Sequence, residues 1–170
     1  NAGTGFHSND ARGTTMRVDP SSGAPADRVT PLARATGAEF GLRTIAVPRL
    51  QSTLSVWTLG LASELIFIGD AGTTEAGRPS RRSGIEFANY YHPVRWLTVD
   101  ADVAWSRARF RDADPAGSSI PGSVRTVASG GATVETARGL VGALRLRYFG
   151  ARPLVEDGSV QSKPTALLNG

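Results

Sequence analysis

A strict alternation of apolar and polar side chains between Trp96 and Phe110 limits what this chain can fold into. One set of alternate positions holds Leu97, Val99, Ala101, Val103 and Trp105, and the other holds Thr98, Asp100, Asp102 and Ser106. Positions two apart share a face of a strand but point to nearly opposite sides of a helix, so the pattern predicts a β-strand. Because the two carboxylates need water, and because aromatic residues lie near both ends, the strand is typical of a wall between hydrocarbon and an aqueous lumen.

The composition is compatible with a β-barrel of the outer membrane. The chain has 170 residues, with 20 Gly, 10 Pro and 40% hydrophobic residues, which suits one domain or part of one. No apolar run approaches the roughly 18 residues of a transmembrane helix, so a membrane assignment rests on strands. Alternate polar residues in such strands explain the mean hydropathy of -0.16. The absence of Cys excludes a disulfide framework and a thiolate metal site.

The basic charge does not predict a nucleic-acid partner. The formal net charge is +4, but the basic residues are scattered from Arg12 to Arg152. They form no Lys/Arg run, helix-turn-helix pattern or platform with aromatic residues. The nearest to a cluster is Arg78, Arg81 and Arg82, which would lie at the mouth of a strand. There they would form a solvated rim or contact anionic lipid head groups.

The two ends of the sequence predict a fragment of a longer protein. Residue 1 is Asn, and no basic and apolar segment with a cleavage site follows it. The last six residues, 165–170, resemble the opening of another strand and lack a closing aromatic residue.

The pattern predicts seven strands and the beginning of an eighth. The predicted segments are Ala2–His7, Ala38–Ala46, Leu50–Ile68, Arg82–His92, Trp96–Phe110, Val124–Glu135 and Leu140–Phe149, with a further stub from Lys163. The joints alternate in length: residues 8–33, 69–80, 111–122 and 150–162 are long, whereas those near Pro48, Pro93 and Arg138 are short. Two features fit less well. The segment Val124–Glu135 is weakly patterned and rich in Ala and Gly, and Asn89 falls on the apolar side of its strand.

The rhythm of the joints separates two folds that share the strand pattern. A soluble β-sandwich, which remains an alternative, does not require every second joint to be long. An outer-membrane barrel has short periplasmic turns and longer extracellular loops. We therefore predict an all-β fold, an antiparallel up-and-down transmembrane β-barrel segment of about seven or eight strands from a larger barrel. The turns near Pro48, Pro93 and Arg138 would face the periplasm.

Alternation in the other strands predicts a set of charges that face the lumen. These residues are Glu39, Arg43, Glu86, Asp100, Asp102, Arg145 and Arg147. An Arg that faced hydrocarbon at mid-depth would cost about 2 to 4 kcal/mol, so the polar face has to be the inner one. The charges would form a hydrated wall in which neighbours pair. Alternatively, some of them would contact a mobile inner domain or line a substrate path.

Catalytic and metal motifs are not evident. The only histidines, His7 and His92, have no paired-His or His-Glu-x-x-His spacing, so no metal site is expected. His7 precedes Ser8 and Asp10 closely, but proximity in sequence does not establish a triad. Residues 69–74 lack the Gly-Lys-Ser/Thr ending of a phosphate-binding loop. We predict no catalytic residue and no cofactor; the alternative is an outer-membrane barrel enzyme or adhesin that uses His7 with Asp10 or surface Arg residues.

Five segments carry a family resemblance through their order and spacing. They are Gly5–Asp10 (GFHSND), Gly37–Thr44 (GAEFGLRT), Ser63–Glu75 (SELIFIGDAGTTE), Arg81–Tyr91 (RRSGIEFANYY) and Leu144–Pro153 (LRLRYFGARP). Together they resemble the barrel of TonB-dependent outer-membrane receptors. The resemblance implies a barrel of 22 strands, filled by an N-terminal plug, in the outer membrane of a Gram-negative bacterium. Such a receptor imports scarce nutrients, such as iron-siderophores or cobalamin, with energy relayed from the inner membrane.

The resemblance also implies partners and a division of labour. The wall would contact outer-membrane lipid and the plug of the same parent chain, whereas TonB would bind through the missing N-terminal part. The long loops would collect a small-molecule substrate, with Asp70, Thr73 and Arg78 as the candidate ligand-binding residues. The fragment alone is expected to be inactive, and to aggregate or stay unfolded, because open strand edges in hydrocarbon cost several kcal/mol for each unpaired group.

Overall fold

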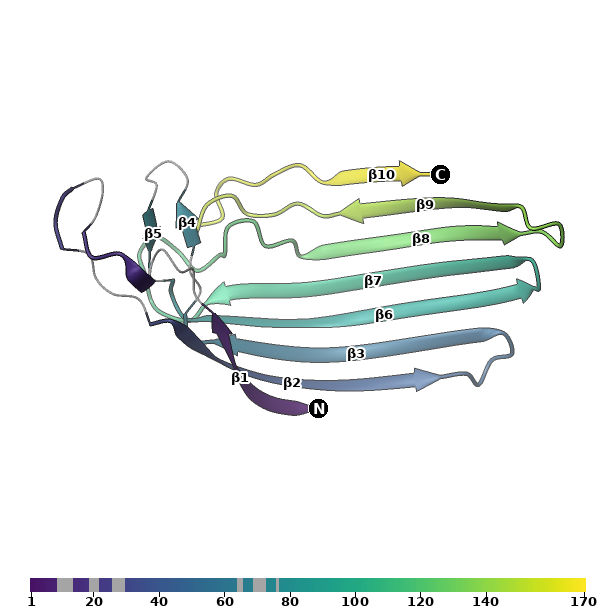
Figure 1. Cartoon of the computed structure of the whole chain (residues 1–170), viewed down its shortest axis with the longest axis horizontal. Coiled ribbons are helices and arrows are strands. Elements are labelled where there is room, and N and C mark those ends of the chain that lie inside the picture. Colours follow the sequence, from purple (N-terminus) through teal and green to yellow (C-terminus); the bar gives the residue numbers. More distant parts are fainter. Residues whose placement is uncertain (9–13, 19–21, 26–29, 64–65, 69–72, 76) are drawn as a thin grey trace.

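Eight antiparallel strands form one sheet in which each strand pairs with its neighbours along the chain (Figure 1). The structure, a computed structural model, describes residues 1–8, 14–18, 22–25, 30–63, 66–68, 73–75 and 77–170. The strands of the sheet, in spatial order, are β1 (Ala2–Ser8), β2 (Leu32–Thr44), β3 (Leu50–Leu61), β6 (Ser80–Val94), β7 (Leu97–Phe110), β8 (Thr126–Glu135), β9 (Val141–Phe149) and β10 (Thr165–Asn169). The short strands β4 (Ile66–Ile68) and β5 (Thr73–Glu75) form a separate hairpin. The fold is therefore all-β, antiparallel and up-and-down, as predicted.

The seven joints of the sheet follow the predicted alternation of lengths. Residues 45–49, 95–96 and 136–140 are the short turns, and they lie together at one end of the sheet, which we call the short-turn edge (Figure 1). The longer joints, 9–31, 62–79, 111–125 and 150–164, connect the strands at the opposite end, the long-loop edge. No helix formed by the described residues is long and apolar enough to cross a membrane.

Two predicted strand boundaries are wrong. β2 begins at Leu32 rather than Ala38, because the polar segment 34–37 pairs with β1 along one side and, from Ala35, with β3 along the other. The predicted strand Leu50–Ile68 ends at Leu61, and its last three residues form β4 instead. In both cases the backbone partners decide where the strand begins or ends, and local polarity does not.

The predicted turn near Pro93 is also displaced. β6 continues through Val94, and only Arg95 and Trp96 connect it to β7. Pro93 lies within β6, where the register with β7 shifts between Tyr91 and Val94. A proline cannot donate a backbone hydrogen bond, and an irregularity of this kind is where a strand tolerates one.

The two faces of the sheet differ in polarity. The register places all five acidic residues of the eight strands on one face, which we call the polar face: Glu39, Glu86, Asp100, Asp102 and Glu135. The opposite, apolar face carries Phe40, Val103 and Leu146, which are 72%, 48% and 52% exposed. In the described part of the chain, no second layer covers this face. The seven charged residues that were predicted to share a face do so.

The buried apolar side chains of the described residues lie at the long-loop edge. They are Ala33, Leu61, Phe110, Ile120 and Pro153, and Ser80 is fully buried with them. Backbone hydrogen bonds join the loops above the strands there, from Phe110 N to Ser118 O and from Ser119 N to Glu156 O. The long-loop edge thus holds a small core that the rest of the sheet lacks.

The hairpins are staggered along the sheet. One row of successive partners runs through Leu42, Leu54, Phe87, Val103, Ala128 and Tyr148. Leu42 and Leu54 each lie six residues from Pro48, the centre of the turn that joins their strands. Phe87 and Val103 each lie eight residues from Arg95, and Ala128 and Tyr148 each lie ten residues from Arg138. The row therefore rises by two residues per hairpin, or one per strand. With a rise of about 3.4 Å per residue and a strand spacing of about 4.8 Å, this stagger tilts the strands by roughly 35°.

Candidate functional site

An ion pair crosses the middle of the polar face. Arg145 on β9 donates through Nη2 to Oδ1 of Asp100 on β7 over a distance of 2.7 Å, passing across β8. The residue between them is Gly131, and a Cβ added there would lie 3.3 Å from the same guanidinium nitrogen. Asp100 is only 5% exposed. The pair exists because the strand between its partners has no side chain at this position.

The next row of the polar face holds three predicted charges that do not pair with one another. Arg43, Asp102 and Arg147 lie in one row of strand partners. Ser129 lies between Asp102 and Arg147, and its hydroxyl donates to Asp102 Oδ2 over 3.3 Å. Arg43 donates to the side-chain oxygen of Gln51. Arg147 is exposed and forms no ion pair with any described residue.

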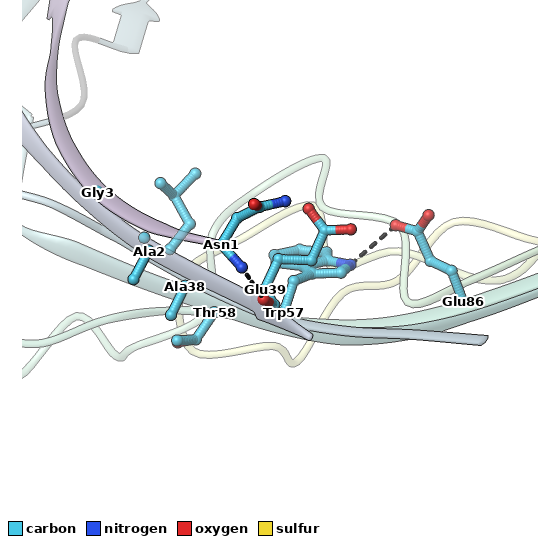
Figure 2. Close-up of a pocket in the computed structure, with 10 residues that line it drawn as sticks. Asn1, Ala2, Gly3, Ala38, Glu39, Trp57, Thr58 and Glu86 are labelled. Carbon is cyan, nitrogen blue, oxygen red and sulfur yellow. Dashed lines mark hydrogen bonds between the residues drawn. The ribbon is translucent and has the colours of Figure 1, made fainter. Parts of the chain in front are cut away.

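A shallow groove on the polar face lies near the start of β1 (Figure 2). It has a volume of about 580 Å³ and is lined by Asn1, Ala2, Gly3, Gly37, Ala38, Glu39, Trp57, Thr58, Leu59 and Glu86. Trp57 Nε1 donates to Glu86 Oε1 over 2.8 Å, and the hydroxyl of Ser55 donates to Glu39 Oε1 over 3.3 Å. Two carboxylates beside an indole ring suit a ligand that carries a cationic group next to an apolar surface.

The indole of Trp57 lies across Gly84 on the neighbouring strand. A Cβ at Gly84 would lie 2.8 Å from Cζ2 of the indole and 2.9 Å from the backbone oxygen of Trp105. Gly84 under Trp57 therefore repeats the arrangement of Gly131 under Arg145. In each case a glycine lets a long side chain from an adjacent strand lie flat and reach its partner.

Arg78 connects the loops at the long-loop edge. Its guanidinium donates to Asp112 over 2.8 Å and to Glu156 over 2.6 Å, and its carbon lies 4.3 Å from the ring centroid of Phe110. The hydrogen bond from Arg78 lowers the pKa of Asp112. Asp112 and Glu156 come from two long joints and Arg78 from a third, so Arg78 ties the three joints together. Its predicted contact with a ligand stays a prediction, since both carboxylates already engage its charge.

The other predicted ligand-binding and catalytic residues form no site within the part of the chain that the structure describes. Asp70 and Asp10 lie outside the described residues, and Thr73 is the first residue of β5. His7 is exposed on β1, whereas His92 Nδ1 lies 3.0 Å from the hydroxyl of Thr98. Across the described ranges, no three His, Cys, Asp or Glu residues are grouped to hold a metal ion.

Sequence reasoning missed Trp57, Asp112 and Glu156, together with the two glycines of the polar face. Alternation would have placed Trp57 opposite Leu54 and Val56, on the polar side of β3. No signal in the sequence pairs Arg78 with acids that lie 34 and 78 positions away. The structure also explains Asn89, which seemed misplaced on the apolar face. Its side chain accepts a hydrogen bond from Ser52 over 2.7 Å and donates to the backbone oxygen of Ala101 over 3.4 Å.

Comparison with models of known protein families finds no match to this chain, and comparison with curated proteins finds none either. The functional argument therefore depends on the sheet itself and on the residues that its two faces present.

Proposed function

We propose that this chain forms part of the wall of an outer-membrane β-barrel in a Gram-negative bacterium, with the apolar face against lipid and the polar face toward a water-filled lumen. The observation that carries this proposal is the inverted burial along β7. Asp100 is 5% exposed, whereas Val99, Val103 and Trp105 are 36%, 48% and 50% exposed. In a water-soluble protein, a carboxylate is rarely buried while a whole row of large apolar side chains is exposed. A transmembrane barrel places its apolar side chains on the outside and its polar side chains on the inside.

The dimensions of the apolar face support the same proposal. From Leu97 to Trp105, β7 advances eight residues, which at a tilt of roughly 35° spans about 22 Å along the membrane normal. The apolar band of an outer-membrane barrel is about 25 Å tall and is flanked by aromatic girdles. Trp105 and Tyr148 lie ten residues from their turns, and Tyr91 lies four residues from its turn, so aromatic side chains flank the band on both sides.

The open edges of the sheet support a larger barrel. β1 and β10 lie at the two edges and do not pair with each other. In hydrocarbon, each unpaired backbone N–H or C=O would cost several kcal/mol, so a membrane wall needs further strands to close it. The 22-stranded barrel implied by the resemblance to TonB-dependent receptors would supply them.

We propose further that the parent protein is a receptor for active uptake of a scarce nutrient, such as an iron-siderophore or cobalamin. This segment would serve as part of its wall and would catalyse no reaction. The family resemblance of five segments supports it. The polar face would contact the plug of the parent chain, and its charged rows offer groups for that contact. The loops that Arg78 connects through Asp112 and Glu156 would form part of the outer ligand-collecting surface.

Cysteine accessibility in native membranes tests the wall. Val103→Cys on the apolar face and Ala104→Cys on the polar face change adjacent positions of the same strand. A water-soluble maleimide is expected to label the cysteine at 104 and to spare the one at 103 until the membrane is dissolved and the protein is unfolded. Labelling at 103 in intact membranes, to the same extent as after unfolding, would overturn the proposal.

Removal of residues 66–75 from the complete protein tests the receptor function. This deletion keeps Arg78 and its two carboxylate partners, so the remaining loops stay connected. We expect uptake of the cognate nutrient to fall while the protein still assembles in the outer membrane. Unchanged uptake would exclude this loop from the binding site.

A further inference from the structure

Four arginines interrupt the apolar face at one level. The strands carry no acidic residue on this face, yet they place Arg34, Arg81, Arg107 and Arg109 on it. All four are exposed. Arg34 lies 14 residues from Pro48, and Arg81 and Arg109 each lie 14 residues from Arg95, with Arg107 at 12. These four residues, which we call the arginine belt, therefore share the long-loop edge of the apolar face.

The arginine belt lies just beyond the aromatic level. Arg107 and Arg109 follow Trp105 by two and four residues on the same face of β7, which places them about 6 and 11 Å further along the membrane normal. Trp and Tyr girdles mark the boundary between acyl chains and head groups. The guanidinium groups thus lie at the level of lipid head groups.

The arginine belt lacks internal compensation. Arg81 and Arg109 are direct strand partners on one face, and like charges in that relation destabilise a sheet. None of the four guanidinium groups forms an ion pair within the part of the chain that the structure describes. An external anion would remove the repulsion, and guanidinium forks match phosphate oxygens well.

A hollow on the apolar face adjoins Arg81. It has a volume of about 340 Å³ and is lined by Thr36, Gly37, Ala38, Thr58, Gly60, Arg81 and Arg111. Small residues create the space, since a Cβ at Gly60 would lie 3.3 Å from the hydroxyl of Thr36. Two threonine hydroxyls and two guanidinium groups suit a head group that carries both hydroxyls and phosphate.

We propose that the arginine belt and this hollow bind a phosphorylated glycolipid of the membrane leaflet at the long-loop edge. Its phosphates would contact Arg81 and Arg109, its sugar would enter the hollow, and its acyl chains would lie along the exposed apolar side chains below. This inference rests on the proposed membrane wall. Phosphate on a lipid, rather than free phosphate, fits because the charges and the apolar surface are continuous.

Lipid binding by the complete protein tests the inference. The protein is purified and titrated with lipid A in phosphatidylcholine bilayers, and bound lipid is measured by native mass spectrometry. The double variant Arg81→Gln/Arg109→Gln is compared with Arg95→Gln/Arg138→Gln, which removes the same charge from exposed residues at the short-turn edge. Since a basic residue near an anionic surface contributes about a fivefold effect, we expect roughly thirtyfold weaker binding in the first variant only.

A second variant separates the hollow from the charge. Ala38→Leu fills the hollow and leaves every arginine in place, so it is expected to weaken binding of lipid A but not of phosphatidylglycerol. Equal binding by the wild type and the Arg81/Arg109 variant would overturn the inference. Equal losses in both double variants, an unchanged Ala38→Leu, or complete displacement of lipid A by inorganic phosphate would overturn it as well.

The cysteine at position 103, introduced into the same samples, distinguishes this failure from failure of the membrane wall. If maleimide labels it, the wall and the lipid site are both wrong. If it stays protected while lipid A shows no preference for the arginine belt, only the lipid site is wrong.

Discussion

The two faces of this sheet are built on different principles. On the polar face, long side chains find defined partners across strands, as Arg145 does with Asp100 and Trp57 with Glu86. On the apolar face, large side chains are exposed, and the hydrogen-bonded amide of Asn89 is an exception. The difference teaches that the polar face supplies specific geometry, whereas the apolar face is adapted to a surrounding medium that is not water.

The largest effect is expected from a charge introduced at the middle of the apolar face. Val103→Arg is expected to lower the free energy of unfolding by about 2 to 4 kcal/mol, because a guanidinium would enter hydrocarbon. The neighbouring Ala104→Arg on the polar face is the control, and it should cost much less. Both are measured by denaturant titration of the complete protein in lipid vesicles. Equal losses would show that the two faces meet the same medium.

The polar face is tested next by removal of one partner from its ion pair. Arg145→Met leaves the nearly buried carboxylate of Asp100 without its cation, and we expect a loss of about 2 kcal/mol in the same titration. Arg147→Met removes an equal charge from the same strand, at an exposed position without an ion pair among the described residues, and should have little effect. Comparable losses in the two variants would remove the special role of this pair.

A smaller effect is expected from the glycine beneath Trp57. Gly84→Ala would bring a Cβ within 3 Å of the indole and of a backbone oxygen, so overpacking should cost about 1 to 2 kcal/mol. Gly142→Ala meets no atom within 4 Å and is the matched control. The control should be neutral or slightly stabilising, since alanine restricts the unfolded chain. Destabilisation by Gly142→Ala alone would contradict this account.

The smallest effect concerns pH at the long-loop edge, beyond both faces. Arg78 lowers the pKa of Asp112, so the stabilisation from this pair is present above the ordinary aspartate range and is lost as pH falls through the lowered pKa. Cleavage of residues 111–125 by an acid-tolerant protease should therefore rise only at acidic pH. In Arg78→Gln, cleavage should already be fast near neutral pH. Identical pH profiles in the two proteins would exclude Arg78 as the connection.

Much of the fold follows from local pattern. Alternation in Leu97–Phe110 predicted both the strand and its two faces, and the rhythm of long and short joints predicted the order of the sheet. Boundaries were less predictable. Arg34–Gly37 is polar yet lies in β2, because its backbone pairs with β1 and, from Ala35, also with β3. Ile66–Ile68 is apolar yet lies outside the sheet.

Site geometry depends on contacts that are distant in sequence. Charges on the polar face were predicted as a set, but nothing in the sequence distinguishes Arg145, which pairs with Asp100, from Arg147, which does not. The intervening strand, β8, makes the difference. Gly131 leaves room for the guanidinium of Arg145 to reach Asp100, whereas the side chain of Ser129 lies between Arg147 and Asp102. The apparent weakness of the Ala- and Gly-rich strand β8 is thus the condition for the ion pair.

The sequence by itself determined the strand period, the alternation of joint lengths and the separation of acidic from apolar side chains, because each of these depends only on positions close in the chain. Tertiary structure alone decided the register, the stagger of one residue per strand and the level at which Arg34, Arg81 and Arg109 lie together. The physical reason is that backbone hydrogen bonds between strands set these relations, and local side-chain pattern does not specify which residues become partners.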